Sequence, residues 1–539
     1  MPLQPPSPYT RRDFLRQLAG TATMAGLVGP GLYAARAASG PPLATTRSGR
    51  IAGRVERDIH VFRGVPYGGD TTRRRFQRAV REATWTGTRD ATRFGASAPQ
   101  RGDADGQSVS EDCLFLNLYT PALRDGGKRP VLFYIHGGGY NNGSGSHPLY
   151  DGVNLCRRGD VVVVTVNHRL NAFGYLYLGE SGDERLRDAG TVGQLDLIDA
   201  LRWVREHAHE FGGDAGNVTV FGQSGGGAKI ATLMAMPEAD GLFHRAMTMS
   251  GQQVTAAGPR AAAQRTALFL AELGLGPRDT AALLAMPMAC LLEATRVRDP
   301  SRAEGTSLYF GPVLDTHNLP RHPFYPDAPA QSARIPMVIG NTRDETRAFL
   351  GNDEANFALT WDQLPQKLRE QQYVDLSPEV VIAEYRRLYP DYTPSEVFFA
   401  ATTAGRSWRG AIIEAEERAK QGAPAWVYQL DWRSPAEGGR LRAFHTLDIP
   451  LVFDNVAAKG SKTGDDARAR AMAARMSEAL IALARHGDPN HAGLPDWAPY
   501  TLPQRQTMVL DDTPRMQDDP RGGERKLYQR VPFVQRGTM

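Results

Sequence analysis

The chain has 539 residues, of which 41% are hydrophobic and 23% charged, so it has the composition of a globular protein and the length to bury a large core. Its 63 lysines and arginines barely exceed its 59 aspartates and glutamates, which gives no electrostatic case for nucleic-acid binding. The cysteines, Cys113, Cys156 and Cys290, are widely spaced and match neither a disulfide framework nor a metal-ligand pattern. We therefore expect no metal site, and nothing in the sequence calls for a cofactor.

Residues 1–37 have the layout of a twin-arginine export signal. The pair Arg11-Arg12 precedes a weakly apolar stretch, and the A-x-A triplet at 35–37 is typical of a cleavage site. A membrane anchor is the alternative, but three glycines and a proline interrupt the apolar stretch, which makes it a poor spanning helix. We expect a single mature domain over residues 38–539, a periplasmic or secreted location, and no stable membrane insertion after cleavage.

Strands and helices are predicted to alternate along the mature chain, which indicates an α/β domain with a mostly parallel sheet. Residues 194–211 repeat apolar side chains at helical spacing before a Gly-Gly stop. The mixed, mainly helical segments 260–305 and 352–420 are expected to be insertions that cap the sheet. Short apolar runs predict buried strands at 131–135, 161–166, 218–221, 246–249, 336–340 and 426–430.

The stretch VTVFGQSGGGAKI at 218–230 sets Ser224 among four glycines, between a strand and a helix that we expect to begin at Ala228. Gly222 and Gly226 let the backbone pass close on either side of the serine. This G-x-S-x-G pattern is typical of a nucleophile elbow, in which a strained turn exposes the serine hydroxyl at the edge of a sheet. An ordinary glycine-rich turn with a solvated serine would show the same pattern, so other segments have to distinguish the two.

Three further segments supply what a nucleophilic serine requires: a base, a carboxylate that orients the base, and N–H donors for an oxyanion. A predicted strand leads straight into HGGG at 136–139, and Gly225 adds a second source of N–H donors. Downstream, Asp344-Glu345 follows a strand and His445 lies in a later loop, which is the order serine, acid, histidine of α/β hydrolases. Taken alone, such an acid is more often a surface residue and such a histidine a solvated one.

Several of these segments, together with others along the mature chain, resemble the type-B carboxylesterase family, which includes bacterial p-nitrobenzyl esterases, cholinesterases and liver-type carboxylesterases. The resemblance implies an α/β-hydrolase fold, with a mostly parallel central sheet flanked by helices and helical insertions capping the active site. It also implies a serine hydrolase that acts on small-molecule carboxylic esters through an acyl-enzyme. The matching stretches include SEDCLFLNLY, YIHGGGY, FGGDAGNVTVFGQSGGG, IGNTRDETRAF and AFHTLDIPLVF.

The resemblance also implies roles for individual positions. The implied nucleophile, acid and base are Ser224, Glu345 and His445, and the implied oxyanion hole is Gly138, Gly139 and Gly225. Two structural ion pairs are implied as well, Arg75 with Glu111 and Arg169 with Asp196.

The chain departs from the family at a few of these positions. Gly225 replaces a usual alanine, Gln223 a usual glutamate, and Lys229 a common serine. An N–H donor survives the change to Gly225. We expect Gln223 and Lys229 to lie near the base and to alter its environment, in a direction that the sequence does not give. Cys113 lacks the family's upstream partner cysteine, so we expect a free, packed thiol.

Two other functions remain open at this stage. An acyltransferase would use the same triad with another acceptor, and a non-catalytic binding protein would share the fold but typically lose a triad member. Tyr140, Tyr309 and Phe310 are candidates to line the substrate pocket, with ordinary core packing as the alternative. The sequence does not give the natural ester or the oligomeric state.

The arginine pair generates the first testable prediction. Changing Arg11 and Arg12 together to lysine should trap full-length precursor in the cytoplasm, because the export receptor reads the arginines. Cell fractionation would locate the protein, and N-terminal sequencing of the exported form should begin near Ala38. Export of the double variant at the unmodified level would rule out a twin-arginine signal.

Overall fold

The computed structural model describes residues 40–535, except residue 103 and residues 301–305. The predicted export signal and the start of the mature domain near Ala38 lie outside these residues. No helix in the described part combines the length and the apolar character that a membrane span requires.

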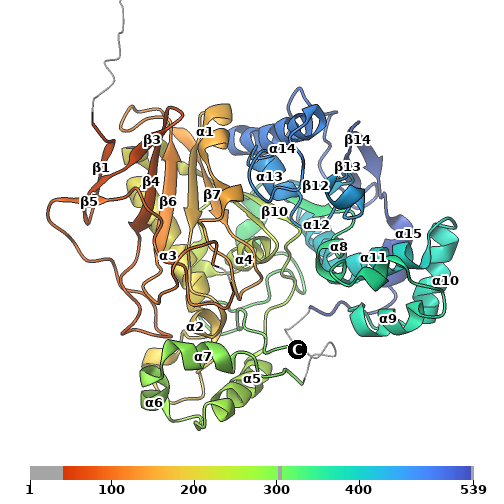
Figure 1. The fold of residues 1–539 in the computed structure, drawn as a ribbon, viewed down its shortest axis with the longest axis horizontal. Coiled ribbons are helices and arrows are strands. Elements are labelled where there is room, and N and C mark those ends of the chain that lie inside the picture. The colour runs from red at the N-terminus through yellow and green to blue at the C-terminus, as the bar shows by residue number, and fades with distance from the viewer. Residues whose placement is uncertain (1–39, 103, 301–305, 536–539) are drawn as a thin grey trace, which may run out of the picture. The chain divides into compact units, whose positions relative to one another are not determined.

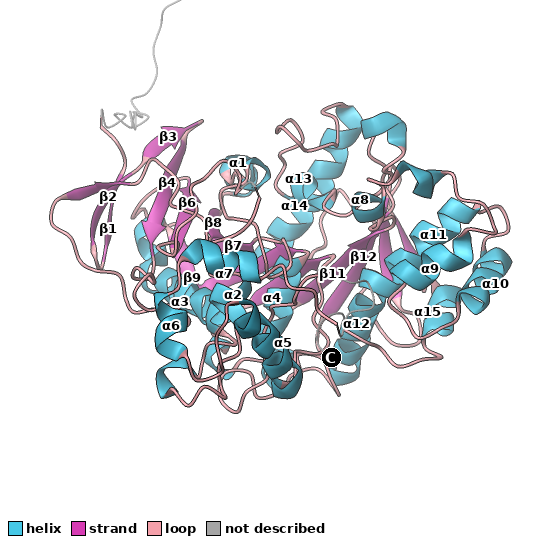
Figure 2. Ribbon diagram, turned by 60° about the horizontal axis from the view of Figure 1, so that its bottom comes forward, coloured by secondary structure: helices cyan, strands magenta, loops and turns pink. Residues whose placement is uncertain are grey.

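The described residues contain a central sheet of eleven strands in the order β14-β13-β12-β11-β10-β9-β7-β8-β6-β4-β3. The seven strands from β13 to β8 pair in parallel, while β14 at one end and β6, β4 and β3 at the other are antiparallel. Figure 2 shows the sheet crossing the molecule from β3 to β12. The strands are β3 (Arg54–Glu56), β4 (Ile59–Pro66), β6 (Phe115–Thr120), β7 (Arg129–Ile135), β8 (Val162–Val166), β9 (Gly213–Gln223), β10 (Arg245–Met249), β11 (Met337–Thr342), β12 (Ala425–Leu430), β13 (Gln506–Leu510) and β14 (Arg515–Asp518). A small separate sheet holds β1 (Leu43–Thr46), β2 (Gly49–Ala52) and β5 (Thr88–Asp90).

Helices cover both faces of the sheet, which is why its central strands read as unbroken apolar runs. On β9, Val220 packs into the core on one face and the next residue, Phe221, into the core on the other. One face carries α3 (Val192–His207), α4 (Gly225–Leu233) and α12 (Arg409–Gln421). The other carries α1 (Val153–Gly159), α13 (Asp448–Val452) and α14 (Ala467–His486), as Figure 1 shows for α14 beside α1.

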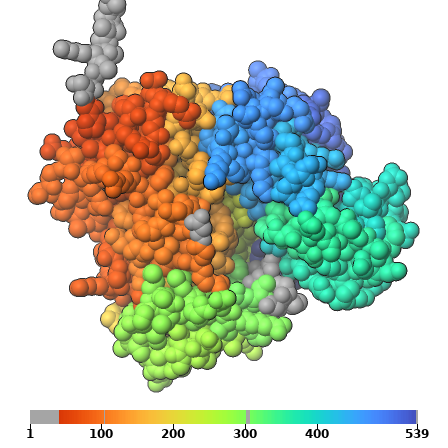
Figure 3. All heavy atoms as spheres, in the orientation of Figure 1, coloured from red at the N-terminus to blue at the C-terminus, as the bar shows by residue number. Residues whose placement is uncertain are grey.

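Two helical insertions stand out from the sheet and appear as separate protrusions in Figure 3, yellow-green and teal. The first holds α5 (Pro259–Glu272), α6 (Thr280–Ala285) and α7 (Met288–Ala294). The second holds α9 (Leu364–Gln371), α10 (Pro378–Leu388) and α11 (Pro394–Thr403), and a π-helical turn, Ala404–Trp408, joins α11 to α12. The remaining helices are α2 (Asn171–Tyr175), α8 (Arg347–Leu350) and α15 (Gly522–Tyr528).

The predicted α/β fold with a mostly parallel sheet is confirmed. Each predicted strand is present with its ends within two residues, except that β9 begins at Gly213, five residues before the predicted start at Val218. The helix predicted to begin at Ala228 instead begins at Gly225, because close packing against the sheet overrides the low helix propensity of three glycines. The helix predicted over 194–211 ends at His207 and tightens into a 3₁₀ turn, Ala208–Phe211. Cys113 is a free, buried thiol.

Both implied ion pairs are present. Arg75 binds the carboxylate of Glu111 through Nε and Nη2, with Nε 2.7 Å from Oε2. Arg169 binds Asp196 at 2.6 Å, with both side chains almost fully buried. The carbonyl of Arg169 also packs against the backbone at Gly193, so this pair fixes the loop after β8 to the start of α3.

Candidate active site

Ser224 occupies a strained turn between β9 and α4. Its φ of 56° and ψ of −126° are unusual for a residue with a side chain. The surrounding backbone holds it there: its N–H donates to the carbonyl of Met249 at 2.8 Å, and a Cβ added at Gly226 would lie 1.9 Å from the carbonyl oxygen of Ile135. Within the described residues the Ser224 hydroxyl has no hydrogen-bond partner, so it is available to a molecule in the cavity.

The glycine loop after β7 lies directly against this turn. Gly138 and Gly139 have φ values of 83° and 61°, in the region that favours glycine, and both are exposed to the cavity. A Cβ added at Gly225 would lie 2.0 Å from the carbonyl oxygen of Gly139, so the loop and the first residue of α4 touch backbone to backbone. The three predicted oxyanion glycines therefore lie around one space, beside Ser224.

Glu345 and His445 meet at the carboxyl edge of the sheet. Glu345 follows β11 and is fully buried, and its Oε2 accepts a hydrogen bond from Nδ1 of His445. Its Oε1 accepts from the backbone N–H of Thr342 at 2.9 Å. Burial alone would raise the pKa of Glu345, but the adjacent imidazole and these hydrogen bonds lower it below its ordinary value. The carboxylate is thus ionised and aimed at the histidine.

Asp344, the other half of the acid pair, faces elsewhere. Its carboxylate binds Arg347 at 3.3 Å, and its backbone N–H donates to the carbonyl of Ala443. It borders a different surface hollow, with Arg343 and Asp431, and does not line the cavity that contains Ser224. Geometry therefore favours Glu345 as the partner of His445.

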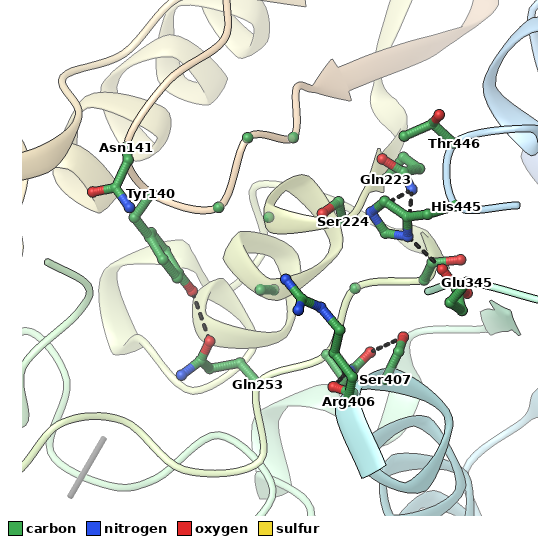
Figure 4. Close-up of a pocket in the computed structure, with 18 of the residues that line it drawn as sticks. Tyr140, Asn141, Gln223, Ser224, Gln253, Glu345, Arg406, Ser407, His445 and Thr446 are labelled. Carbon is green, nitrogen blue, oxygen red and sulfur yellow. Dashed lines mark hydrogen bonds and ion pairs between the residues drawn. The ribbon is translucent and has the colours of Figure 1, made fainter. Parts of the chain in front are cut away.

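Gln223 is a second contact of the imidazole. Its amide nitrogen lies 3.2 Å from Nε2 and 3.4 Å from Nδ1 of His445, as Figure 4 shows. The ring of Phe349 lies 4.7 Å from the imidazole, and the guanidinium of Arg406 lies 4.1 Å from the centre of that phenyl ring. Gln223 is therefore near the histidine as predicted, and it brings an uncharged amide.

Lys229 does not contact the histidine, which corrects the expectation that it lies near the base. Its ammonium group donates to the carbonyls of His136 and Gly139, at 3.2 and 2.8 Å. The cause is its position one turn into α4, which directs the side chain beneath the glycine loop.

The shared cavity has a volume of about 530 Å³ and a lining that is about equally polar and apolar (Figure 4). Tyr140 and Tyr309 line it, and the hydroxyl of Tyr140 donates to Gln253 at 2.9 Å. Phe310 instead packs in the core, 5.8 Å from the ring of Phe269. Lining residues that the sequence did not indicate include Ser250, Gln252, Gln253, Phe349, Arg406 and Ser407.

Of these added lining residues, Phe349 ends the stretch IGNTRDETRAF, whereas Arg406 and Ser407 come from a segment without a recognised motif. Arg406 and Ser407 lie in the π-helical turn, whose extra residue per turn is not readable from hydrophobic periodicity. Across the described ranges, no three histidine, cysteine or carboxylate side chains are grouped so that they could hold a metal ion.

The chain is similar in sequence and in fold to known esterases. The chain is 34% identical over 505 residues to a para-nitrobenzyl esterase of Bacillus subtilis, covering 90% of this chain and 98% of that protein. It is 34% identical over 495 residues to a phenmedipham hydrolase of Pseudarthrobacter oxydans, covering 87% and 95%. The crystal structure of a carboxylesterase of Geobacillus stearothermophilus superposes with a TM-score of 0.80 at 37% identity, covering 90% and 100%.

The sequence profile of the Carboxylesterase family matches residues 40–527, which is nearly all of the described chain. That match spans the elbow, the glycine loop and the segments that carry Glu345 and His445. The chain therefore belongs to the carboxylesterase family and is a carboxylic ester hydrolase.

Proposed function

We propose that this hydrolase cleaves its ester through an acyl-enzyme formed on Ser224, with His445 as the base and Glu345 as the acid that orients it. The observation that carries the proposal is the hydrogen bond from Nδ1 of His445 to the buried carboxylate of Glu345, beside a serine held in a strained turn. With Nδ1 donating to Glu345, the lone pair of Nε2 faces the serine side and can accept a proton.

The reaction proceeds in two halves. Ser224 Oγ bonds to the ester carbonyl carbon as its proton passes to Nε2 of His445; the ester C–O bond then breaks, and the alcohol leaves with that proton. Water repeats the sequence on the acyl-enzyme, gives its proton to His445 and releases the acid as Oγ recovers a proton. Ionised Glu345 stabilises the imidazolium that forms in each half.

The N–H groups of Gly138, Gly139 and Gly225 bind the carbonyl oxygen as it becomes an oxyanion. Their support is the close approach of loop and elbow and the exposure of Gly138 and Gly139 to the cavity. Each such donor contributes on the order of 10²–10³ in turnover in comparable sites. The mixed polar and apolar lining and the volume of about 530 Å³ suit a small ester.

The nucleophile can be tested by labelling. At neutral pH an organophosphonate probe should label Ser224, and Ser224→Ala should abolish labelling without loss of folding, since the hydroxyl carries no hydrogen bond to a described residue. His445→Ala should also suppress labelling, because the serine then has no base. Mass spectrometry of the labelled peptide reads the result. A label on another serine, or full labelling without His445, would refute the assignment.

Substitution of each adjacent acid in turn distinguishes the two candidate carboxylates. Glu345→Gln should lower kcat by roughly 10³–10⁴-fold, because the imidazolium loses its ionised partner. Asp344→Asn is the matched control, since that carboxylate binds Arg347 outside the cavity, and it should change kcat little. Steady-state kinetics on p-nitrophenyl butyrate measures both. A larger loss in the Asp344 variant would overturn the choice of Glu345.

The contact between Gln223 and His445 predicts that a charge added at Gln223 will shift the pH dependence of kcat/KM. Gln223→Glu would place a carboxylate where the amide now contacts His445, and a nearby negative charge favours the imidazolium. The base would then be free only at higher pH, so the acidic limb of kcat/KM should move up by about one pH unit. Gln252→Glu, which adds the same charge to the cavity away from the imidazole, should move it less. An unchanged or lowered limb in the Gln223 variant would contradict the contact.

A further inference from the structure

Lys229 is a fully buried lysine beneath the glycine loop. Its relative exposure is 0%, and its ammonium group donates to the carbonyl oxygens of Gly139 at 2.8 Å and His136 at 3.2 Å. These two carbonyls bracket the segment that carries Gly138. The ammonium also lies 5.4 Å from the centre of the Tyr140 ring, within cation–π range. One side chain of α4 thus binds both ends of the loop that faces the ester.

No carboxylate among the described residues forms an ion pair with this ammonium, and burial lowers the pKa of Lys229 to about 7. The rings that face it are neutral: burial and the lysine charge lower the pKa of His136 to about 3 and that of His168 well below its ordinary value. Behind the Tyr140 ring lie Tyr175 and Glu414. Burial raises the pKa of all three, that of Glu414 to about 8.

Gly225 and Lys229 both lie against the carbonyl of Gly139. The oxygen of Gly139 accepts from Lys229, and it lies 2.0 Å from where a Cβ on Gly225 would be. A side chain at 225 would therefore push the carbonyl away from the lysine. The glycine leaves the space, and the ammonium group supplies the attraction that draws the loop into it.

We propose that Lys229 is a positioning residue of the oxyanion hole. Its ammonium group fixes the carbonyls of His136 and Gly139 to α4, so that the intervening N–H groups keep their direction toward the cavity. Its positive charge, in a region shielded from water, also favours the oxyanion that develops on the other side of the loop. The inference rests on the proposed function of this site.

The buried charge of Lys229 also lowers the stability of the folded protein, by an amount that depends on pH. The pKa of Lys229 is lower in the folded chain than in the unfolded one, so the unfolded state binds more protons between pH 7 and 10.5. This loss of stability is greatest below about pH 7 and disappears as the pH approaches 10.5. Removing the ammonium should therefore impair turnover while leaving the protein equally or more stable, which a purely structural role would not do.

The decisive variant is Lys229→Met, which keeps the aliphatic volume and removes the charge. We expect kcat on p-nitrophenyl butyrate to fall about ten- to a hundredfold with little change in KM. Affinity for a trifluoromethyl ketone, which adds to Ser224 as an oxyanion, should fall by the same factor. The thermal midpoint at pH 6 should stay the same or rise. The wild type should also lose turnover above about pH 7 through a limb that the variant lacks.

Thr232→Val is the matched control, one turn further along α4. Thr232 is buried, and its hydroxyl donates within the helix to the carbonyl of Ala228 at 2.9 Å. Its kcat and ketone affinity should match the wild type. If Lys229→Met keeps its full kcat, or loses kcat and thermal stability together, the positioning role is wrong. Failure of the proposed function itself would appear separately, as a wild-type enzyme that the phosphonate does not label at Ser224.

A double-mutant cycle tests the shared carbonyl. Gly225→Ala alone should lower kcat, because the added Cβ displaces the Gly139 carbonyl from Lys229. In the Lys229→Met background that bond is already absent, so the same change should cost clearly less. Additive losses would show that the two positions do not act on one carbonyl, and would overturn the proposed link between them.

Discussion

The site depends on a contact between two stretches of bare backbone. The first turn of α4 reaches the end of β7 and the loop beyond it so closely that a single methyl group at Gly225 or Gly226 would overlap a carbonyl oxygen. Such an approach places a helix N-terminus, with its unpaired N–H groups and partial positive charge, at the carboxyl edge of the sheet. The unusual dihedral angles of Ser224 follow from it, because the chain must reverse from strand to helix within one residue.

The fixed charges of this site are opposite in sign to the charges that would develop next to them during the reaction. Ionised Glu345 lies where an imidazolium would form, and the buried ammonium of Lys229 lies behind the loop that would receive an oxyanion. Gln223, which contacts His445, adds no charge of its own. Such fixed charges need little rearrangement during the reaction, which makes them more effective than the same charges in water.

The sequence predicted the elements whose signal is local. Apolar runs located the parallel strands, and glycine patterns located the elbow and the HGGG loop. Periodicity could not show that Asp344 turns away from the cavity while Glu345 faces His445, because adjacent side chains differ only in direction. Nor could it show Lys229 beneath the loop, a contact between residues about ninety positions apart. The wall supplied by Arg406 depends on how the second insertion packs, which no short motif encodes. Phe349 ends a recognised stretch, but its position against the imidazole depends on tertiary packing.

The π-helical turn at Ala404–Trp408 makes one wall of the cavity sensitive to chain length. An extra residue in a helical turn rotates everything on that turn by about 100° relative to a regular helix. Loss of a single residue there would restore regular winding and carry Arg406 and Ser407 around the helix, while α11 and α12 kept their own packing. Relatives could thus exchange the chemistry of this wall by insertion or deletion, leaving every catalytic position unchanged.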